Sequence, residues 1–212
     1  MRFDLPPVTR ALLIANVVLF GLQQLFNEAL LIHFALWPIG DRAIAGVGTV
    51  GFELWQLVSY GFLHGSLTHL LFNMLALWMF GGTIERLFGS RPFAVYYLVS
   101  VIGAALAQLA VIAWFTGGFY PTVGASGGVF GVLLAFGMMY PHNRIMLIFP
   151  PVPMPAWLFV TGYGLLELYL GITGTQAGVA HFAHLGGMAA GFVLIQYWRG
   201  RLPWKPRRIL MR

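Results

Sequence analysis

Two residues with the chemistry of a serine hydrolase, Ser126 and His184, stand in an otherwise apolar chain. Ser126 belongs to a Gly-Ala-Ser-Gly motif at residues 124–127, which we expect to begin a helix. A serine hydroxyl is a weak nucleophile until a base takes its proton, and imidazole titrates near neutral pH. The free N–H groups at a helix N-terminus can stabilise an oxyanion. The pair therefore predicts nucleophilic catalysis, with Ser126 as nucleophile and His184 as general base.

Two further polar residues, His69 and Asn73, stand four residues apart and therefore share one face of a helix. We expect them to donate hydrogen bonds to the oxyanion, together with the backbone N–H of Ser126. No acidic residue is expected at the depth of His184, so the sequence favours a serine–histidine dyad over a triad. Glu167, near the outer end of its apolar segment, has no assigned role.

Three other interpretations compete with catalysis. Serines and glycines in membrane helices commonly serve close packing, and the pairs Gly127/Gly131 and Gly187/Gly191 fit that pattern. A zinc site could use the histidines, but the chain has no His-Glu-x-x-His motif and no nearby carboxylate base, so no metal or cofactor is expected; the histidines concerned are His64, His69, His181 and His184. A transporter would also hold polar groups at mid-depth, yet no inverted repeat is apparent.

Composition places these residues in a membrane. Of the 212 residues, 59% are hydrophobic and 8% are charged, whereas a soluble domain carries about 25% charged residues. Cysteine is absent, which excludes disulfides and thiolate chemistry. The net charge of +6 does not indicate nucleic-acid binding, because the basic residues flank apolar runs. We expect membrane lipids as surroundings.

The apolar runs predict an all-α polytopic protein with six transmembrane helices in one domain, residues 1–198. The predicted spans cover about residues 10–27, 67–88, 92–115, 125–140, 155–170 and 178–198. The first run is expected to be a retained span rather than a signal peptide. Residues 28–66 are aromatic-rich and predict a membrane-embedded or interfacial loop. Residues 199–212 predict a basic cytoplasmic tail.

Orientation follows from counting basic residues. With a cytoplasmic N-terminus and six spans, eleven of the twelve Lys and Arg residues lie inside and only Arg42 lies outside. At 1.5 Å per residue, Ser126, His184 and Asn73 each lie about 20 Å from the inner end of their helix. In a hydrocarbon core about 30 Å thick they share a layer about 10 Å below the outer surface.

The motifs also resemble the rhomboid intramembrane serine proteases across all six predicted spans. The matching segments are His-Gly-Ser-Leu-Thr-His-Leu-Leu-Phe-Asn at 64–73, a GxxxExxxG pattern at 81–89, GxSG at 124–127 and AHxxG at 183–187. The resemblance implies that Ser126 and His184 are catalytic, and that His69, Asn73 and the Ser126 N–H form the oxyanion hole. It implies that the fifth span and the loop before His181 form a lateral gate and cap.

The family resemblance further implies cleavage of transmembrane protein substrates near the outer membrane face, after a small residue. It suggests a bacterial cytoplasmic membrane as the location. The alternative is a non-catalytic relative that binds transmembrane segments; such relatives typically lose the serine or the histidine, and this chain keeps both. The oligomeric state is not predicted.

Several supporting residues follow from the same motifs. Gly124, Gly127 and His181 lie beside the predicted pair, and Glu85 is expected to tie helix ends together, with Arg86 or nearby groups. Two positions depart from the family pattern. Gln56 replaces an arginine, so an ion pair is lost, and Phe130 replaces a tyrosine. We expect Phe130 to stack on His184 without donating a hydroxyl hydrogen bond.

Overall fold

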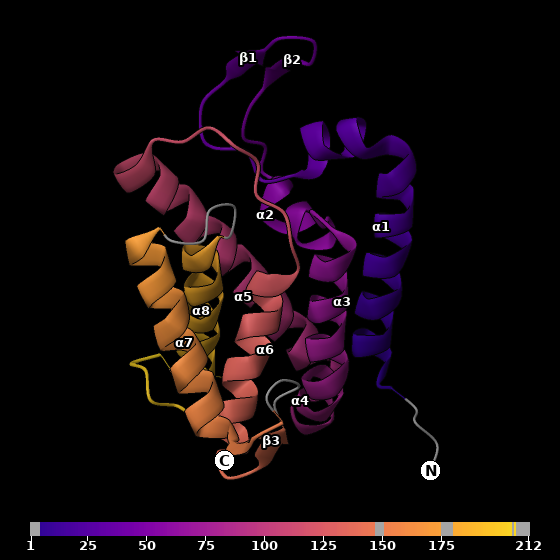
Figure 1. The fold of residues 1–212 in the computed structure, drawn as a ribbon. Helices are drawn as coiled ribbons and strands as arrows, with labels where there is room; N and C mark the ends of the chain where they lie inside the picture. The colour runs from indigo at the N-terminus through magenta and orange to yellow at the C-terminus, as the bar shows by residue number, and fades with distance from the viewer. Residues whose placement is uncertain (1–4, 147–150, 175–179, 205, 207–212) are drawn as a thin grey trace.

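The computed structural model describes residues 5–146, 151–174, 180–204 and 206, and these form a bundle of helices (Figure 1). The long helices are α1 (Pro7–Phe34), α3 (Leu67–Ala76), α4 (Gly82–Phe88), α5 (Ser90–Val111), α6 (Ser126–Met139), α7 (Ala156–Thr173) and α8 (His181–Trp198). Short π-helical turns, Leu77–Gly81 and Ile112–Thr116, join α3 to α4 and extend α5. Two small hairpins complete the fold, β1 (Arg42–Ile44) with β2 (Gly48–Val50) and β3 (Arg144–Met146) with β4 (Pro153–Pro155).

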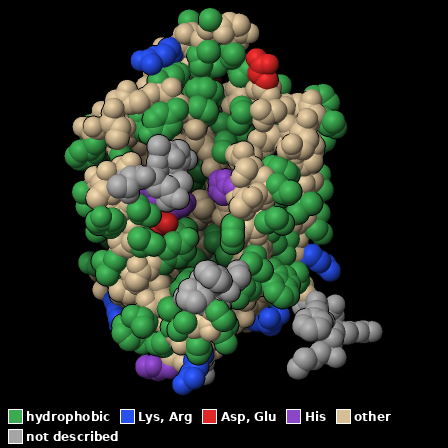
Figure 2. Space-filling view, viewed as in Figure 1, with side chains coloured by type: hydrophobic (Ala, Val, Ile, Leu, Met, Phe, Trp, Pro, Cys, Tyr) green, Lys and Arg blue, Asp and Glu red, His purple; other side chains and the backbone are tan. Residues whose placement is uncertain are grey.

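Four of the described helices are long and apolar enough to cross a membrane: α1, the continuous helix Leu67–Phe88, α5 with its π turn, and α7. Helix α6 is apolar but shorter, and α8 is 18 residues long without being among the four. Hydrophobic side chains are spread over the whole visible surface, and charged side chains are few (Figure 2). The chain is therefore an all-α, multi-pass integral membrane protein, as predicted, while the count of six spans stays a prediction.

Helix α6 lies in the middle of the bundle, with α1 and α7 at opposite sides (Figure 1). Eleven of its fourteen residues are buried. Helices α5, α6 and α8 pack closely because glycines leave no side chain between them. A Cβ atom on Gly103 would lie 2.3 Å from Ala190, and one on Gly127 would lie 2.3 Å from Ala104. The small-residue packing expected from the sequence is therefore real, and it positions the site described below.

The segment between the first two long helices differs from its prediction. Helix α1 consists of two helices joined at a kink, where Phe26 has non-helical backbone angles; the first ends close to the predicted residue 27, and the second continues to Phe34. The remainder folds as the β1–β2 hairpin, a short helix α2 (Gln56–Ser59) and a 3₁₀ turn, Tyr60–Phe62. The sequence predicts an irregular aromatic piece here, because a three-residue strand leaves little periodicity to detect.

Gln56 organises this segment through hydrogen bonds instead of an ion pair. Its side chain is 1% exposed, and its Oε1 accepts the backbone N–H groups of Trp37 at 3.1 Å and Glu53 at 3.2 Å. Its Nε2 donates to the carbonyl of Gly51 at 3.3 Å. A neutral amide can both donate and accept, so it satisfies three backbone groups in a buried position.

Glu85 joins helix ends, and its partners are the second of the two predicted kinds, nearby groups other than Arg86. Its carboxylate accepts the N–H groups of Val8 and Thr9, at 3.0 and 2.7 Å, and the hydroxyls of Thr9 and Ser90, at 2.8 and 2.7 Å. These four bonds place a negative charge at the N-terminus of α1, where unpaired N–H groups favour it. Among the described residues, the bonding partners of Glu85 are these three and not Arg86.

Some predictions fall on residues that are outside the described part of the chain. They include most of the loop before His181, at 175–179, and much of the basic tail, at 205 and 207–212. Helix α8 begins at His181 rather than near residue 178, and α7 extends to Thr173 rather than ending near residue 170.

Candidate active site

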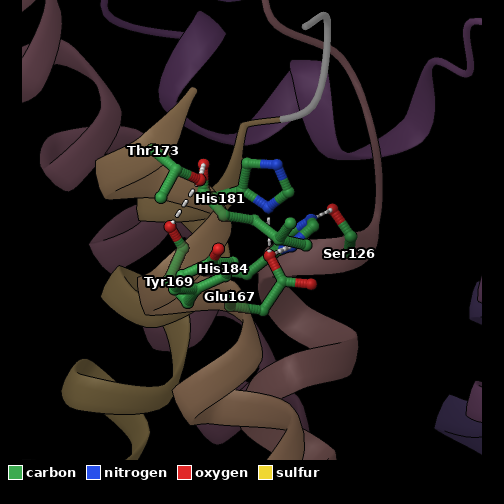
Figure 3. Close-up of polar contacts among 7 residues, drawn as sticks. Ser126, Glu167, Tyr169, Thr173, His181 and His184 are labelled. Carbon is green, nitrogen blue, oxygen red and sulfur yellow. Dashed lines mark hydrogen bonds and ion pairs between the residues drawn. The ribbon is translucent and has the colours of Figure 1, made fainter. Parts of the chain in front are cut away.

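Ser126 and His184 meet in the structure across 58 residues of sequence. Ser126 is the first residue of α6, and His184 is in the first turn of α8. The Oγ atom of Ser126 lies 2.8 Å from Nε2 of His184 (Figure 3). This distance is within the range for proton transfer between a hydroxyl and a general base.

The close packing of α6 and α8 accounts for the meeting. A Cβ atom on Gly187 would lie 2.1 Å from the carbonyl oxygen of Gly127, so only glycine fits at that crossing. Gly127 and Gly187 each stand within three residues of a member of the pair, Ser126 or His184. The crossing therefore sets the separation of the serine and histidine side chains.

Gly124 serves a second close approach. Its φ angle is +137°, a conformation that favours glycine, and a Cβ there would lie 2.9 Å from Nε2 of His69 and 3.4 Å from Oγ of Ser126. His69 thus lies on the same side of the loop as Ser126, where the oxyanion is expected. Asn73 is buried, and its Nδ2 donates to the carbonyl of His69 at 3.1 Å. The oxyanion role of Asn73 stays a prediction; its Nδ2 carries a second hydrogen, which the bond to His69 does not use.

The expectation that no acidic residue lies beside His184 is wrong. Glu167, on α7, points its carboxylate at the far side of the imidazole, with Oε2 2.8 Å from Nδ1 of His184 (Figure 3). The same oxygen lies 2.6 Å from Nδ1 of His181. All three side chains are buried. The geometry is that of a serine, histidine and carboxylate in line, with a second histidine on the carboxylate.

The sequence held a signal for Glu167. Helix α7 runs in the opposite direction to α6 and α8, and Glu167 stands six residues before its last residue, Thr173. Six residues correspond to about 9 Å of helix, which is the depth estimated for Ser126 and His184. The depth count covered the three helices with obvious polar residues, and extending it to α7 would have placed the carboxylate in the same layer.

Phe130 packs against the flat side of the histidine. Its ring is 4.3 Å from that of His184, and the two planes differ by 6°. The predicted stacking is therefore present. Tyr163 of α7 lies next to Phe130 with ring centroids 5.0 Å apart, so α7 closes this side of the site as well.

Glu167, His181 and His184 are also the described residues that could hold a metal ion, because their ligand atoms lie within 4.8 Å of one another. The predicted alternative of four histidines gathered on zinc does not match this grouping, which leaves out His64 and His69. Those two rings contact each other instead, 5.1 Å apart. Burial lowers the pKa of His64 to about 4, so it stays neutral at neutral pH.

One face of the molecule is hollowed (Figure 2). Figure 2 shows histidine and acidic side chains around a hollow in a face that is otherwise largely hydrophobic. A nucleophile and a base in contact at a helix N-terminus, as Ser126 and His184 are at the start of α6, can attack a carbonyl group and stabilise the resulting oxyanion.

Comparisons with known proteins show the family of the chain. Residues 51–201 match the rhomboid domain family. The chain is 31% identical over 196 residues to Rhomboid protein 1, mitochondrial, of Saccharomyces cerevisiae, covering 85% of this chain and 50% of that protein. It is 28% identical over 208 residues to Rhomboid protease GlpG of Serratia proteamaculans, covering 95% of this chain and 66% of the relative.

A third relative is Rhomboid protease GluP of Bacillus subtilis, 32% identical over 143 residues, which are 66% of this chain and 25% of that protein. The chain thus spans between a quarter and two thirds of the length of these relatives. The matched region contains both Ser126 and His184, and it includes every helix from α2 to α8. The chain belongs to the rhomboid family.

Proposed function

We propose that this chain is an intramembrane serine endopeptidase that cleaves transmembrane protein substrates near the outer face of the membrane. The observation that carries the proposal is the 2.8 Å contact between Oγ of Ser126 and Nε2 of His184. Two relatives whose names include "protease", GlpG and GluP, support the same activity.

The reaction is acyl transfer in two halves. Oγ of Ser126 attacks the carbonyl carbon of the scissile bond while Nε2 of His184 takes the hydroxyl proton. The tetrahedral intermediate collapses, the C–N bond breaks, and the imidazolium gives its proton to the leaving amine. Water then attacks the acyl group, again losing a proton to Nε2, and the carboxylic acid leaves as Ser126 is restored.

The oxyanion would be stabilised by donors at the start of α6. The backbone N–H of Ser126 belongs to the first turn, where no intrahelical acceptor exists. The ring of His69 lies against Gly124, two residues before Ser126, and supplies a second donor. The amide of Asn73 supplies a third through the Nδ2 hydrogen that its bond to the carbonyl of His69 does not use.

The membrane setting of the proposal follows from the charge distribution. Four arginines stand near the ends of α1, α4, α5 and α6 that share one side of the bundle, namely Arg10, Arg86, Arg91 and Arg144. Arg42 is on the β1–β2 hairpin at the opposite side (Figure 1). We therefore propose that both termini lie on the cytoplasmic side of the membrane, with six spans and a basic tail from residue 199. The site then opens toward the outer side.

The test is proteolysis in a defined membrane. The protein is reconstituted with a single-span substrate, and cleavage is compared with that by Ser126→Ala and His184→Ala. Cleavage by the wild type alone supports the endopeptidase. A wild type that binds the substrate without cleaving it identifies a non-catalytic rhomboid relative, and equal cleavage by all three proteins contradicts the roles of Ser126 and His184.

A further inference from the structure

Glu167 holds an unusual place in the fold. Helix α7 lies at the edge of the bundle, and only three of its residues are buried: Ala156, Val160 and Glu167. The first two are within five residues of its start. After Val160, the one buried side chain of α7 is the carboxylate of Glu167, which is 4% exposed. Burying an ionisable group inside a membrane protein costs free energy, so such a group is paired with other polar groups and commonly has a function.

Its partners fix the protonation of the two histidines. A carboxylate only accepts hydrogen bonds, so Oε2 of Glu167 requires a proton on Nδ1 of both His181 and His184. A neutral imidazole with a proton on Nδ1 has a lone pair on Nε2. In His184 that lone pair faces Oγ of Ser126 at 2.8 Å. The contact with Glu167 therefore selects the tautomer that can take the proton from Ser126.

We propose that Glu167 is a positioning residue for His184, and that α7 carries this carboxylate to the site, so the base is oriented only when α7 is seated against α8. This inference rests on the proposed function of Ser126 and His184. The two 2.6–2.8 Å contacts hold the outer half of α7. A displacement of α7 by a few ångströms breaks both, because N–H···O hydrogen bonds require donor–acceptor distances of about 2.7–3.2 Å.

His181 holds the carboxylate of Glu167 through a second hydrogen bond. It begins α8, and it shares Oε2 with His184 without contacting Ser126 among the described residues. A carboxylate oxygen held by one imidazole is fixed in place for the other. Outer groups of this kind typically alter activity about 10- to 100-fold when they are removed, as they do around metal-bound histidines.

The experiment compares Glu167→Gln and Glu167→Asp with the wild type in the substrate assay, in the presence of EDTA to remove any metal ion. We expect kcat to fall about 10- to 100-fold in Glu167→Gln with little change in KM, because an amide can donate to Nδ1 and stabilise the wrong tautomer. The kcat–pH profile should also move along the pH axis. Glu167→Asp, which keeps the carboxylate, should recover part of kcat. The matched control is Glu28→Gln, the same change at an exposed position of α1.

The outcomes separate the two proposals. If Ser126→Ala and His184→Ala are inactive while Glu167→Gln keeps the kcat and pH profile of the wild type, the positioning role is wrong and the protease stands. If the wild type itself does not cleave, the proposed function fails first. A Glu167→Gln protein with lower kcat but an unmoved pH profile, not improved by aspartate, means that Glu167 only anchors α7.

Should Glu167→Gln fail to fold, the wild type still provides a test. Nitrogen-15 NMR of histidine-labelled protein reports which ring nitrogen carries the proton, and His184→Ala assigns the signal. A proton on Nδ1 of His184 supports the inference, and a neutral ring protonated on Nε2 overturns it.

Discussion

The imidazole of His184 is held from three directions by side chains from two helices, α6 and α7. Ser126 of α6 contacts Nε2, Glu167 of α7 contacts Nδ1, and Phe130 covers the ring face at 4.3 Å. An imidazole so fixed loses little freedom when the substrate arrives. Positioning of this kind is a large part of what an enzyme contributes to a reaction.

The stacking contact gives the first prediction. Removing the ring in Phe130→Ala should lower kcat about fivefold to tenfold, because aromatic contacts contribute about 1 kcal/mol beyond area burial. Phe130→Tyr keeps the stack and should remain within about twofold of the wild type. Substrate cleavage at saturating concentration measures both, and an unchanged kcat in Phe130→Ala would show that the stack does not orient the base.

The sequence predicted the pairing of Ser126 with His184 and the stacking of Phe130, since motif identity and helical depth are both readable from residue order. It did not predict the contact of Glu167 with two histidines. That contact depends on the rotation of α7 about its axis, and a helix with nearly uniform hydrophobicity carries no signal for rotation. From the sequence alone, the Glu167 carboxylate could have faced either neighbouring helix or the membrane surface.

At the scale of the helices, the α6–α8 crossing sets the reacting distance. We predict that Gly187→Ala abolishes cleavage and destabilises the protein, because its Cβ would lie 2.1 Å from the carbonyl oxygen of Gly127 and force the helices apart. The loss should exceed 100-fold, since small misplacements of reacting groups cost about that factor.

The control for this substitution is Gly162→Ala on α7, where a Cβ would meet no atom within 4 Å. This change should leave cleavage intact and raise stability by about 0.5–1 kcal/mol through helix propensity. Cleavage rates and thermal unfolding in detergent measure both variants. Equal activity of Gly187→Ala and the wild type would contradict the account of the crossing.

The N-terminus of α1 depends on hydrogen bonds to the carboxylate of Glu85. In Glu85→Gln the single amide oxygen cannot accept all four hydrogen bonds that the carboxylate accepts. The NH₂ group of the glutamine would face N–H and O–H donors instead of acceptors. We expect a loss of about 2–3 kcal/mol and a lower unfolding temperature, because hydrogen bonds to charged groups are the stronger class. Arg86→Gln, at an exposed position of the same helix, should unfold like the wild type.

The helices were predictable within a few residues because hydrophobic runs are long and their ends are polar. The end of α1 was not, since the residues from Glu28 to Phe34 mix one charge, one histidine and several apolar side chains. Their helical state depends on packing, including the hydrogen bond from Trp55 Nε1 to the carbonyl of His33. The β1–β2 hairpin was not predicted, because its three-residue strands show little periodicity.

Over the whole molecule, the two hairpins mark opposite ends of the bundle (Figure 1). The absence of cysteine allows the orientation to be tested with single introduced thiols. Ala45→Cys lies in the turn of the β1–β2 hairpin and His142→Cys in the turn after α6, and both positions are exposed. We expect a membrane-impermeant maleimide to label Ala45→Cys in intact cells, and His142→Cys only after the membrane is opened. The reverse pattern would invert the proposed topology.

The most direct test of the central claim is the reactivity of one oxygen atom. A fluorophosphonate probe reacts with a serine only when a base activates it, and mass spectrometry locates the modified residue. The account predicts labelling of wild-type protein at Ser126, and none in folded His184→Ala. An unlabelled wild type, or equal labelling of Ser126 without His184, would contradict it.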